Sequence, residues 1–360
     1  MIFQQLQLIN YRNHAAAAFD FADGVTLIVG PNGAGKTNIL EAIHLLATGK
    51  SFRAHYDREV VFNPDLGAAR DHTYTEPGFA RVVGKLADAQ GSEILELVIV
   101  KASPYTNVSH KTFKVNGTPK PVSQGAKYFA SVLFCPQDLE LFTGSPALRR
   151  KFLDNLLCRL DQKYKSDHAL YTKAIRQRNR LLENINKTGR GDAELPFWTT
   201  EILRTGTYVQ EKRSQLIQTL NNTVGHLYST LAAQASKVQI NYTINRISLE
   251  RLHQHHAHEI YAKTTLVGPH RDDFDFLLNT YSLSRYGSRG QQRTGVVALK
   301  LCELNLTDQT MGSFPILLLD DIFSELDDSH KQALEEVVQK HQTIITSTHS
   351  NVNAQQIITL

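Results

Sequence analysis

Residues 30–38, GPNGAGKTN, are a glycine-rich stretch whose residue types and spacing suit phosphate binding. The stretch fits the pattern G-x-x-x-x-G-K-[ST], in which backbone N–H groups and the start of a helix surround the β-phosphate of a nucleotide. In such loops Lys36 would reach the β- and γ-phosphates, and the Thr37 hydroxyl would ligate Mg²⁺. The sequence therefore predicts a site for ATP and Mg²⁺.

The segments on both sides of this loop supply the elements that must position it. GVTLIVG, before the loop, is short, apolar and rich in β-branched residues, which predicts a strand. NILEAIHLLATG, after the loop, has apolar residues at helical spacing, and Gly49 is a helix stop. A strand that enters the loop and a helix that leaves it are the context that phosphate binding needs.

A second motif, ILLLDDIFSELDD, places two carboxylates after an apolar run. Such a run is typical of a strand buried on both faces, and ligands bind at the carboxyl ends of strands in open α/β sheets. We expect Asp320 to support Mg²⁺ and Asp321 to orient or deprotonate an attacking water.

A third motif, YGSRGQQRTGVVALKL, predicts a second anion site. Ser288 is placed to cap a helix, and the free N–H groups behind it, near Gly290 and Gln291, can face phosphate. If the loop of one subunit and the Ser288 helix of another hold the same nucleotide, ATP joins a dimer. The segment 324–327, SELD, is then expected to add contacts across that interface.

Composition sets broader limits. The chain has 360 residues and 41% hydrophobic content, enough for a substantial core in two lobes. We find neither an apolar run near the ~20 residues of a membrane span nor a secretion signal at the start, which predicts a cytoplasmic protein. Cys135, Cys158 and Cys302 lack CxxC spacing, so we expect buried thiols rather than disulfides or zinc ligands.

Charge is concentrated in one part of the chain. The net charge is +4, but residues 149–190 contain 12 Lys or Arg against 4 Asp or Glu, a local +8 that leaves −4 for the rest. A segment this basic suits a polyanion, whereas the alternative is a solvated helical face.

The periodicity predicts an α/β fold in which a helical arm interrupts a nucleotide-binding core. Residues 1–130 are strand-rich, and LQLINY, GVTLIVG, EILELVIVK and TFKVNG are the candidate strands. Residues 131–263 form the arm, since Leu148, Phe152, Leu156 and Leu160, and later Trp198, Ile202, Val209, Leu216 and Leu220, follow helical spacing. Residues 264–360 return to the core with the strands FPILLLDD and TIITST.

The order of these motifs resembles that of the ABC-type ATPases, in which two heads enclose two ATP molecules. Within that group the chain is similar to the RecF family of bacterial recombination mediators. The segments that carry the resemblance span nearly the whole chain: LQLINYRN, GPNGAGKTNILEAIHLLATGKSFR, FCPQDLELFTGSPALRRKFLDN, LVGPHRDDFDFLLN, SRGQQRT and ILLLDDIFSELD. The resemblance implies an ABC-type P-loop ATPase head, with the helical arm inserted between the Walker A and signature motifs.

The resemblance also implies roles for individual residues. Gln137, or else Asp138, would sense the γ-phosphate through Mg²⁺ or water, and His349 takes the switch position. Tyr11, Arg12 and Asn13 would lie near the adenine or ribose. The phosphate loop itself would comprise Gly30, Asn32, Gly33, Ala34, Gly35, Lys36, Thr37 and Asn38.

The function implied by resemblance is ATP-dependent DNA binding in recombinational repair. ATP would close a homodimer that binds duplex DNA beside a single-stranded gap, and slow Mg²⁺-dependent hydrolysis would reopen it. The resemblance further implies that the protein helps RecA displace single-strand binding protein, with RecR and RecO as its partners and without contact with a membrane.

Three alternatives are kept. A transporter ATPase subunit shares the nucleotide motifs, but the long basic insert between Gln137 and Ser288 favours a DNA-facing arm. The head of a long coiled-coil chromosome-maintenance protein needs sustained heptads, which the helical block is too short to provide. In the third alternative, ATP is a structural clamp that is not hydrolysed. It differs from hydrolysis in its prediction for Asp321, because replacing this residue should abolish product formation and leave ATP binding intact only if the protein hydrolyses ATP.

Four histidines, His253, His255, His256 and His258, invite a metal hypothesis. Their spacing is irregular and no acidic or Cys ligand set accompanies them, so we interpret the segment as a solvated helix or loop.

Overall fold

The computed structural model describes residues 1–62, 78–88, 91–101, 110–311, 315–325, 331, 334–335, 337–349 and 352–360. The chain divides into two compact units, residues 1–136 with 304–360 and residues 137–303. Within the described part of the chain, no helix is both long and apolar enough to cross a membrane.

The first unit contains an antiparallel sheet with the order β2-β1-β4-β5-β6-β7 among the described residues. Its strands are β1 (Ile2–Tyr11), β2 (His14–Asp20), β4 (Phe79–Asp88), β5 (Gly91–Val100), β6 (His110–Val115) and β7 (Thr118–Lys120). Asn116 and Gly117 form the turn between β6 and β7, where both residues have positive φ angles, 49° and 77°.

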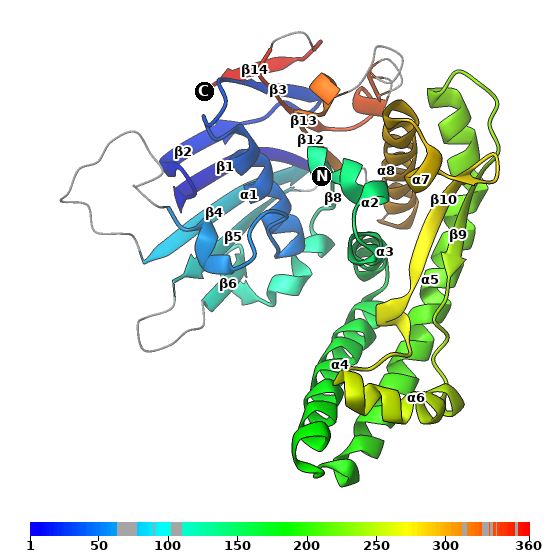
Figure 1. Ribbon diagram of the computed structural model, residues 1–360. Coiled ribbons are helices and arrows are strands. Elements are labelled where there is room, and N and C mark those ends of the chain that lie inside the picture. The colour runs from blue at the N-terminus through cyan, green and yellow to red at the C-terminus, as the bar shows by residue number, and fades with distance from the viewer. Residues whose placement is uncertain are drawn as a thin grey trace. The chain divides into compact units, whose positions relative to one another are not determined.

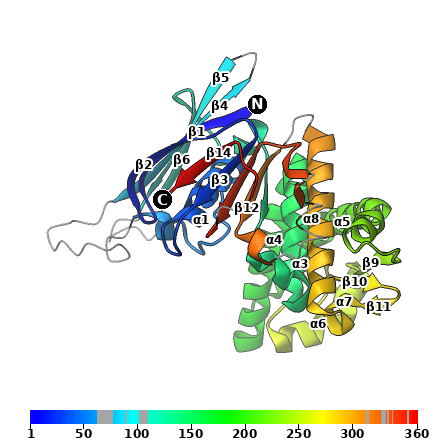
Figure 2. The same cartoon turned by 90° about the horizontal axis from the view of Figure 1, so that it is seen from above.

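The same unit contains a parallel sheet with the order β14-β3-β13-β12-β8 among the described residues. Its strands are β3 (Val25–Val29), β8 (Ser131–Phe134), β12 (Ile316–Asp320), β13 (Thr343–Ser347) and β14 (Gln356–Thr359), and Figure 2 shows β14 beside β3. The interior strand β12, between β13 and β8, is buried at every position, as its unbroken apolar run predicts. The predicted α/β class is therefore present.

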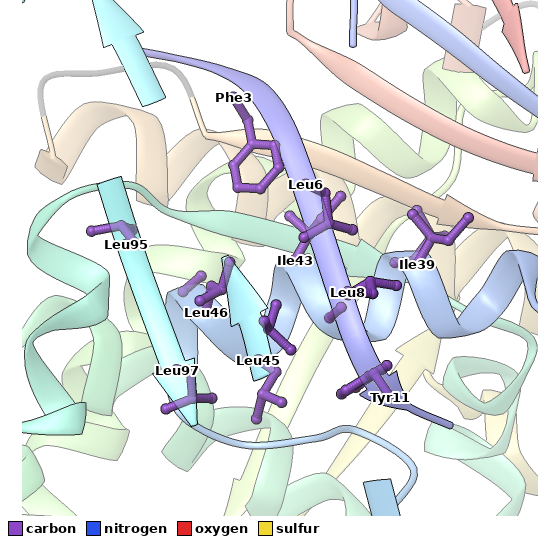
Figure 3. Close-up of a cluster of buried hydrophobic side chains, with 14 of the residues drawn as sticks. Phe3, Leu6, Leu8, Tyr11, Ile39, Ile43, Leu45, Leu46, Leu95 and Leu97 are labelled. Carbon is purple, nitrogen blue, oxygen red and sulfur yellow. The ribbon is translucent and has the colours of Figure 1, made fainter. Parts of the chain in front are cut away.

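Helix α1 (Lys36–Thr48) contacts strands of both sheets in this unit. Its apolar residues meet side chains from β1 and β5, and Figure 3 shows Ile39 and Ile43 with Leu6 and Leu97 in one cluster. The helix ends at Gly49, whose φ of 73° is the left-handed conformation that glycine adopts easily. This packing fixes the direction in which the start of α1 points.

Helices dominate the second unit. They are α2 (Glu140–Thr143), α3 (Pro146–Leu160), α4 (Gln162–Thr188), α5 (Leu195–Leu231), α6 (Leu249–Ala262), α7 (Leu283–Tyr286) and α8 (Arg289–Met311), the last of which continues into the first unit. Figure 1 shows α4 and α5 as a side-by-side pair, and α6 contacts α4. The predicted amphipathic helices correspond to α3 and α5, whereas α4 was not predicted as a separate helix.

A small antiparallel sheet completes this unit, with the order β11-β10-β9 among the described residues. It consists of β9 (Val238–Thr243), β10 (Asp273–Leu278) and β11 (Tyr281–Ser282). Because β10 packs on α3 and β9 packs on α5, residues 264–303 join the helical unit rather than the core to which the sequence analysis assigned them. The division into functional domains remains a prediction.

A buried ionic network lies at the centre of the second unit. Arg213, 2% exposed, contacts Asp154 at 2.8 Å and donates a hydrogen bond to the Pro269 carbonyl at 2.7 Å. The carboxylate of Asp272 accepts a hydrogen bond from the Tyr242 hydroxyl at 2.5 Å. Such charges are tolerated inside a protein only when each is paired and hydrogen-bonded, so the network specifies how the helices meet the sheet.

His168 lies at the edge of this network, 3.2 Å from Asp154. Burial by itself lowers the pKa of His168, but the Asp154 and Cys158 side chains outweigh burial and raise this pKa to about 9, from 6.5. A raised pKa in the folded state stabilises the fold below the unfolded value, and this stability is lost as the pH rises through the folded value.

We therefore predict that the free energy of unfolding of the second unit falls by about 1–2 kcal/mol between about pH 6.5 and 9, after allowance for solvent screening. The His168→Gln variant should lack this fall. Urea titrations that follow the fluorescence of Trp198, the one tryptophan, report on this unit directly. His226→Gln, at an exposed position of α5, is the control and should keep the wild-type slope. An unchanged slope in His168→Gln would contradict the assignment.

Candidate functional site

The phosphate loop lies between the end of β3 and the start of α1, as the sequence predicted. Gly33 and Gly35 have φ angles of 86° and 104°, a region that favours glycine. A Cβ atom at Gly33 would meet nothing within 4 Å, so this part of the loop is open. The N-terminus of α1 and an open, glycine-rich turn form the concave backbone surface that binds anions.

Lys36 is held by the loop itself. Its ammonium group donates hydrogen bonds to the carbonyl oxygens of Gly30 at 2.7 Å and Pro31 at 3.0 Å, and the residue is 8% exposed. These carbonyls keep the charge at the mouth of the loop, where it is available to an incoming phosphate.

The Asp320 carboxylate is the meeting point of three segments. Its Oδ1 atom accepts hydrogen bonds from the hydroxyls of Thr37 at 2.7 Å and Thr346 at 2.8 Å. Asp320 pairs with Thr346 in the register of β12 and β13, so the parallel sheet itself brings these side chains together. A hydroxyl beside a carboxylate is the hard oxygen donor set that Mg²⁺ prefers, so the residues present fit the ion that the loop implies.

Asp321, the next residue, has a strained backbone. Its φ of 49° is left-handed, which is uncommon for any residue but glycine. The conformation is held by its N–H group, which donates to the carbonyl and hydroxyl oxygens of Thr346, both at 3.1 Å. Strain of this kind, maintained by neighbouring contacts, is frequent at functional sites.

His349, the predicted switch residue, follows β13 in the same unit. Its side chain is exposed, and its backbone N–H group donates to the Ser347 hydroxyl at 3.0 Å. In the segment 324–327, which was expected to add contacts across a dimer interface, Leu326 and Asp327 lie outside the described residues.

Asn13 braces the phosphate loop from the β1–β2 turn. Its side chain donates to the Gly33 carbonyl at 3.3 Å and accepts from the Asn38 amide at 2.8 Å. His14 contacts the Gly35 carbonyl through Nε2 at 3.3 Å, and its pKa is lowered by burial, partly offset by this backbone contact. The loop is thereby supported on one side by two neutral polar groups.

Arg12 is committed to an ion pair. It binds both carboxylate oxygens of Glu41, at 2.6 and 2.8 Å, and Glu41 is fully buried in α1. Burial would lower the pKa of Arg12, but Glu41 raises it above its ordinary value. Tyr11 is also fully buried, within the hydrophobic cluster of Figure 3. Of the three residues expected near the base or ribose, Asn13 is the one whose side chain contacts the phosphate loop. Arg12 and Tyr11 contribute to the packing of β1 on α1.

Gln137 and Asp138, the two candidates for sensing the γ-phosphate, lie in a short turn at 136–139 that follows β8. Both belong to the second unit, where Asp138 lies 4.0 Å from the buried ammonium of Lys300. Lys300 is bound more closely by Glu303, at 2.6 Å, so the contact does not decide between the two, and both Gln137 and Asp138 stay candidates.

Ser288 caps α8, as predicted. Its hydroxyl accepts a hydrogen bond from the Gln291 backbone at 3.2 Å, and the Gln291 side chain accepts from the Ser288 backbone at 2.9 Å. This reciprocal capping box uses the N–H group of Gln291, which was expected to face phosphate, and leaves those of Arg289 and Gly290 at an exposed helix end. A Cβ atom on Gly290 would have no neighbour closer than 3.9 Å, and its φ is not positive, so this chain's own folding does not require glycine there.

Many cations of the basic segment 149–190 are used inside the second unit. Five of their ion pairs are Arg149 with Asp273, Arg159 with Glu303, Lys163 with Asp167, Arg178 with Glu259, and Lys187 with Glu183. The pairs with Asp167 and Glu183 lie within the segment and are already counted in its excess of +8. The pairs with Asp273, Glu303 and Glu259 reach outside the segment, so three charges of that excess are paired within the second unit.

Sequence reasoning missed Thr346 and Glu41. The signal for Thr346 was its place at the end of a β-branched strand, but only the strand register shows that it faces Asp320. The signal for Glu41 was a charge among the apolar residues of α1, where a buried carboxylate demands a partner.

The four clustered histidines lie on α6. Among the described residues there is no group of three or more His, Cys, Asp or Glu side chains arranged to hold a metal ion.

Comparison with known proteins gives matches along the whole chain. Residues 2–359 match the family model for the RecF/RecN/SMC N-terminal domain. Proteins named DNA replication and repair protein RecF are 34% identical in Cyanothece sp. and 35% identical in Roseiflexus castenholzii. Each alignment covers 97% of this chain, together with 92% and 93% of the two relatives.

Solved structures agree with this assignment. A structure of the recombination mediator protein RecF-ATP in the RecFOR pathway has a TM-score of 0.86 and 30% identity, and covers 99% of this chain and 95% of that one. An SMC head bound to the C-winged helix domain of ScpA has a TM-score of 0.56 at 14% identity over 100% of this chain and 94% of that one, a likeness of fold alone. The predicted α/β head of the ABC/SMC type is thus confirmed, and the chain belongs to the RecF family.

Proposed function

We propose that this protein is an ATP-dependent DNA-binding protein of recombinational repair, which dimerises on ATP and resets by slow hydrolysis. The observation that carries the proposal is the Asp320 carboxylate held between Thr37 of the phosphate loop and Thr346. This arrangement supports nucleotide binding with Mg²⁺, and RecF relatives solved with ATP support the choice of nucleotide.

Each residue of the loop has a task in this proposal. Lys36 exchanges its two carbonyl partners for the phosphates, and the N–H groups of Gly33, Gly35, Lys36 and Thr37 bind the same oxygens, whereas those of Ala34 and Asn38 bond within the loop. Thr37, Asp320 and Gln137 would hold Mg²⁺, which neutralises charge on the phosphates. Asp321 accepts a proton from the attacking water or orients it, while His349 approaches the γ-phosphate.

The exposed start of α8 supports the proposed dimer. Ser288 and Gln291 bond to each other's backbone N–H groups, which leaves the N–H groups of Arg289 and Gly290, and Gly290 leaves open space beside them. A phosphate carried on the loop of a second copy fits that space, because a helix N-terminus attracts anions and Gly290 presents no side chain. Each nucleotide would then be held by two chains.

The cellular role is proposed from the family. Relatives carry the name DNA replication and repair protein, and a solved relative is described as a recombination mediator in the RecFOR pathway. We propose that the dimer binds duplex DNA next to a single-stranded gap in the cytoplasm and helps RecA displace single-strand binding protein, with RecO and RecR as partners. Contacts to backbone phosphates through Lys and Arg would make the binding depend on salt more than on sequence.

We predict that Asp321→Asn binds ATP as the wild type does but releases phosphate at least about 100-fold more slowly, because the water loses its general base. Asn tolerates the left-handed backbone at this position, so the fold should be kept. Single-turnover phosphate release and equilibrium binding of a fluorescent ATP analogue separate the two effects. Asp23→Asn, a change at an exposed carboxylate, is the control. Wild-type turnover in Asp321→Asn would show that another group activates the water.

We predict that Ser288→Arg abolishes the preference for ATP over ADP in binding a gapped duplex, because the long cation fills the space beside Gly290. For the wild type, fluorescence anisotropy should show about 5- to 150-fold tighter binding in ATP, the usual range of coupling between sites. Gln218→Arg adds the same side chain at an exposed position of α5 and should behave as the wild type. Equal affinity in ATP and ADP for all three proteins would exclude ATP control of DNA binding.

A further inference from the structure

Three cations on α4 have no partner in the described structure. Lys173, Arg176 and Arg180 are exposed, and none of them makes a side-chain hydrogen bond or ion pair with another described residue. At 3.6 residues per turn, their positions fall within about 60° of one another around the helix, with axial steps of about 4.5 and 6 Å. We call this row of three side chains the α4 ridge.

Helix α4 carries both a buried, paired cation and the exposed cations of the ridge. Arg178 lies between two ridge residues in sequence, yet it is 1% exposed and binds Glu259 at 2.6 Å and the Thr265 hydroxyl at 2.8 Å. Arg178 therefore holds α4 to α6. The ridge residues make no comparable contribution to the fold, and like charges spaced three and four residues apart destabilise a helix slightly.

Acidic side chains at both ends of the ridge are already neutralised. Glu183 is bound by Lys187 at 2.6 Å, and Asp167 is bound by Lys163 at 2.8 Å. Arg204 from α5 also approaches Asp167, at 3.5 Å. No carboxylate on α4 is left to screen the ridge, so its field is available to an external anion.

The chemistry of the ridge face favours a duplex over a single strand. Ser166 and Ala169 continue the same face toward the start of the helix, and neither can stack on a base. Proteins that bind single strands use aromatic platforms for stacking, whereas a duplex is bound through its phosphates. The ridge is about 10 Å long, a length over which one strand of a duplex carries roughly three phosphates, at about 3.4 Å each.

We propose that the α4 ridge is a binding surface for the phosphate backbone of duplex DNA. This inference rests on the proposed function, which supplies duplex DNA as the ligand. It assigns DNA binding to three residues of the segment 149–190, in which most other cations make contacts within the second unit.

The test compares duplex binding by wild type and by Lys173→Gln/Arg176→Gln/Arg180→Gln in the presence of ATP over a range of salt concentrations. Fluorescence anisotropy with a blunt duplex and with a single strand of the same length separates the two sources of phosphate. For the duplex we expect affinity to fall about 10- to 100-fold, and the slope of log affinity against log salt to become shallower by about 2 to 3, because each lost contact removes close to one unit.

A matched triple variant keeps the net-charge change constant. Lys85→Gln/Lys120→Gln/Lys237→Gln removes three exposed cations outside α4, and should bind the duplex within about twofold of wild type with the wild-type slope. The swap Lys173→Arg/Arg176→Lys/Arg180→Lys keeps the charges and should keep the affinity. Trp198 fluorescence confirms that all variants are folded.

Two results would overturn the proposal that the α4 ridge binds duplex DNA. One is duplex affinity in the Gln variant equal to that of the control variant, and the other is a loss confined to the single strand. Failure of the proposed function looks different: wild-type duplex binding would then be the same with ATP and ADP, while the ridge variant could still weaken it.

Discussion

The organisation of the nucleotide site depends on one carboxylate, that of Asp320, at the end of β12, an interior strand of a buried parallel sheet. Its oxygen receives hydroxyl hydrogen bonds from the phosphate loop and from the neighbouring strand β13. The parallel register determines which residues meet there, and the packing of α1 on both sheets determines where the loop lies. A shift of either sheet or helix would therefore separate Thr37 from Asp320.

A second layer of polar contacts supports this arrangement from β1. Arg12 binds the buried Glu41 of α1, and Asn13 binds Gly33 and Asn38 around the loop. The Arg12–Glu41 ion pair lies beside an apolar cluster, where neither charge would be tolerated without the other as its partner. The turn between β1 and β2 thus holds the phosphate loop in place.

The sequence was sufficient for features that depend on neighbouring residues. The phosphate loop, the end of α1 at Gly49 and the Ser288 cap all follow from local backbone chemistry, and each is present. Thr346 and Glu41 could not be found in this way, because their partners are distant in sequence and become neighbours only through strand register and helix packing. The charge count of 149–190 likewise could not distinguish Arg178, which is buried and paired, from Arg176, which is exposed and unpaired among the described residues.

The left-handed backbone at Asp321 also limits which carboxylate can work there. Asp and Asn adopt this conformation at lower cost than residues with longer or branched side chains, because their short polar groups bond locally. The strand end therefore selects a carboxylate of short reach, and in the proposed mechanism the attacking water would have to come close to the β12 backbone to meet it. Backbone geometry at one residue would thereby set the depth at which the proposed hydrolysis takes place.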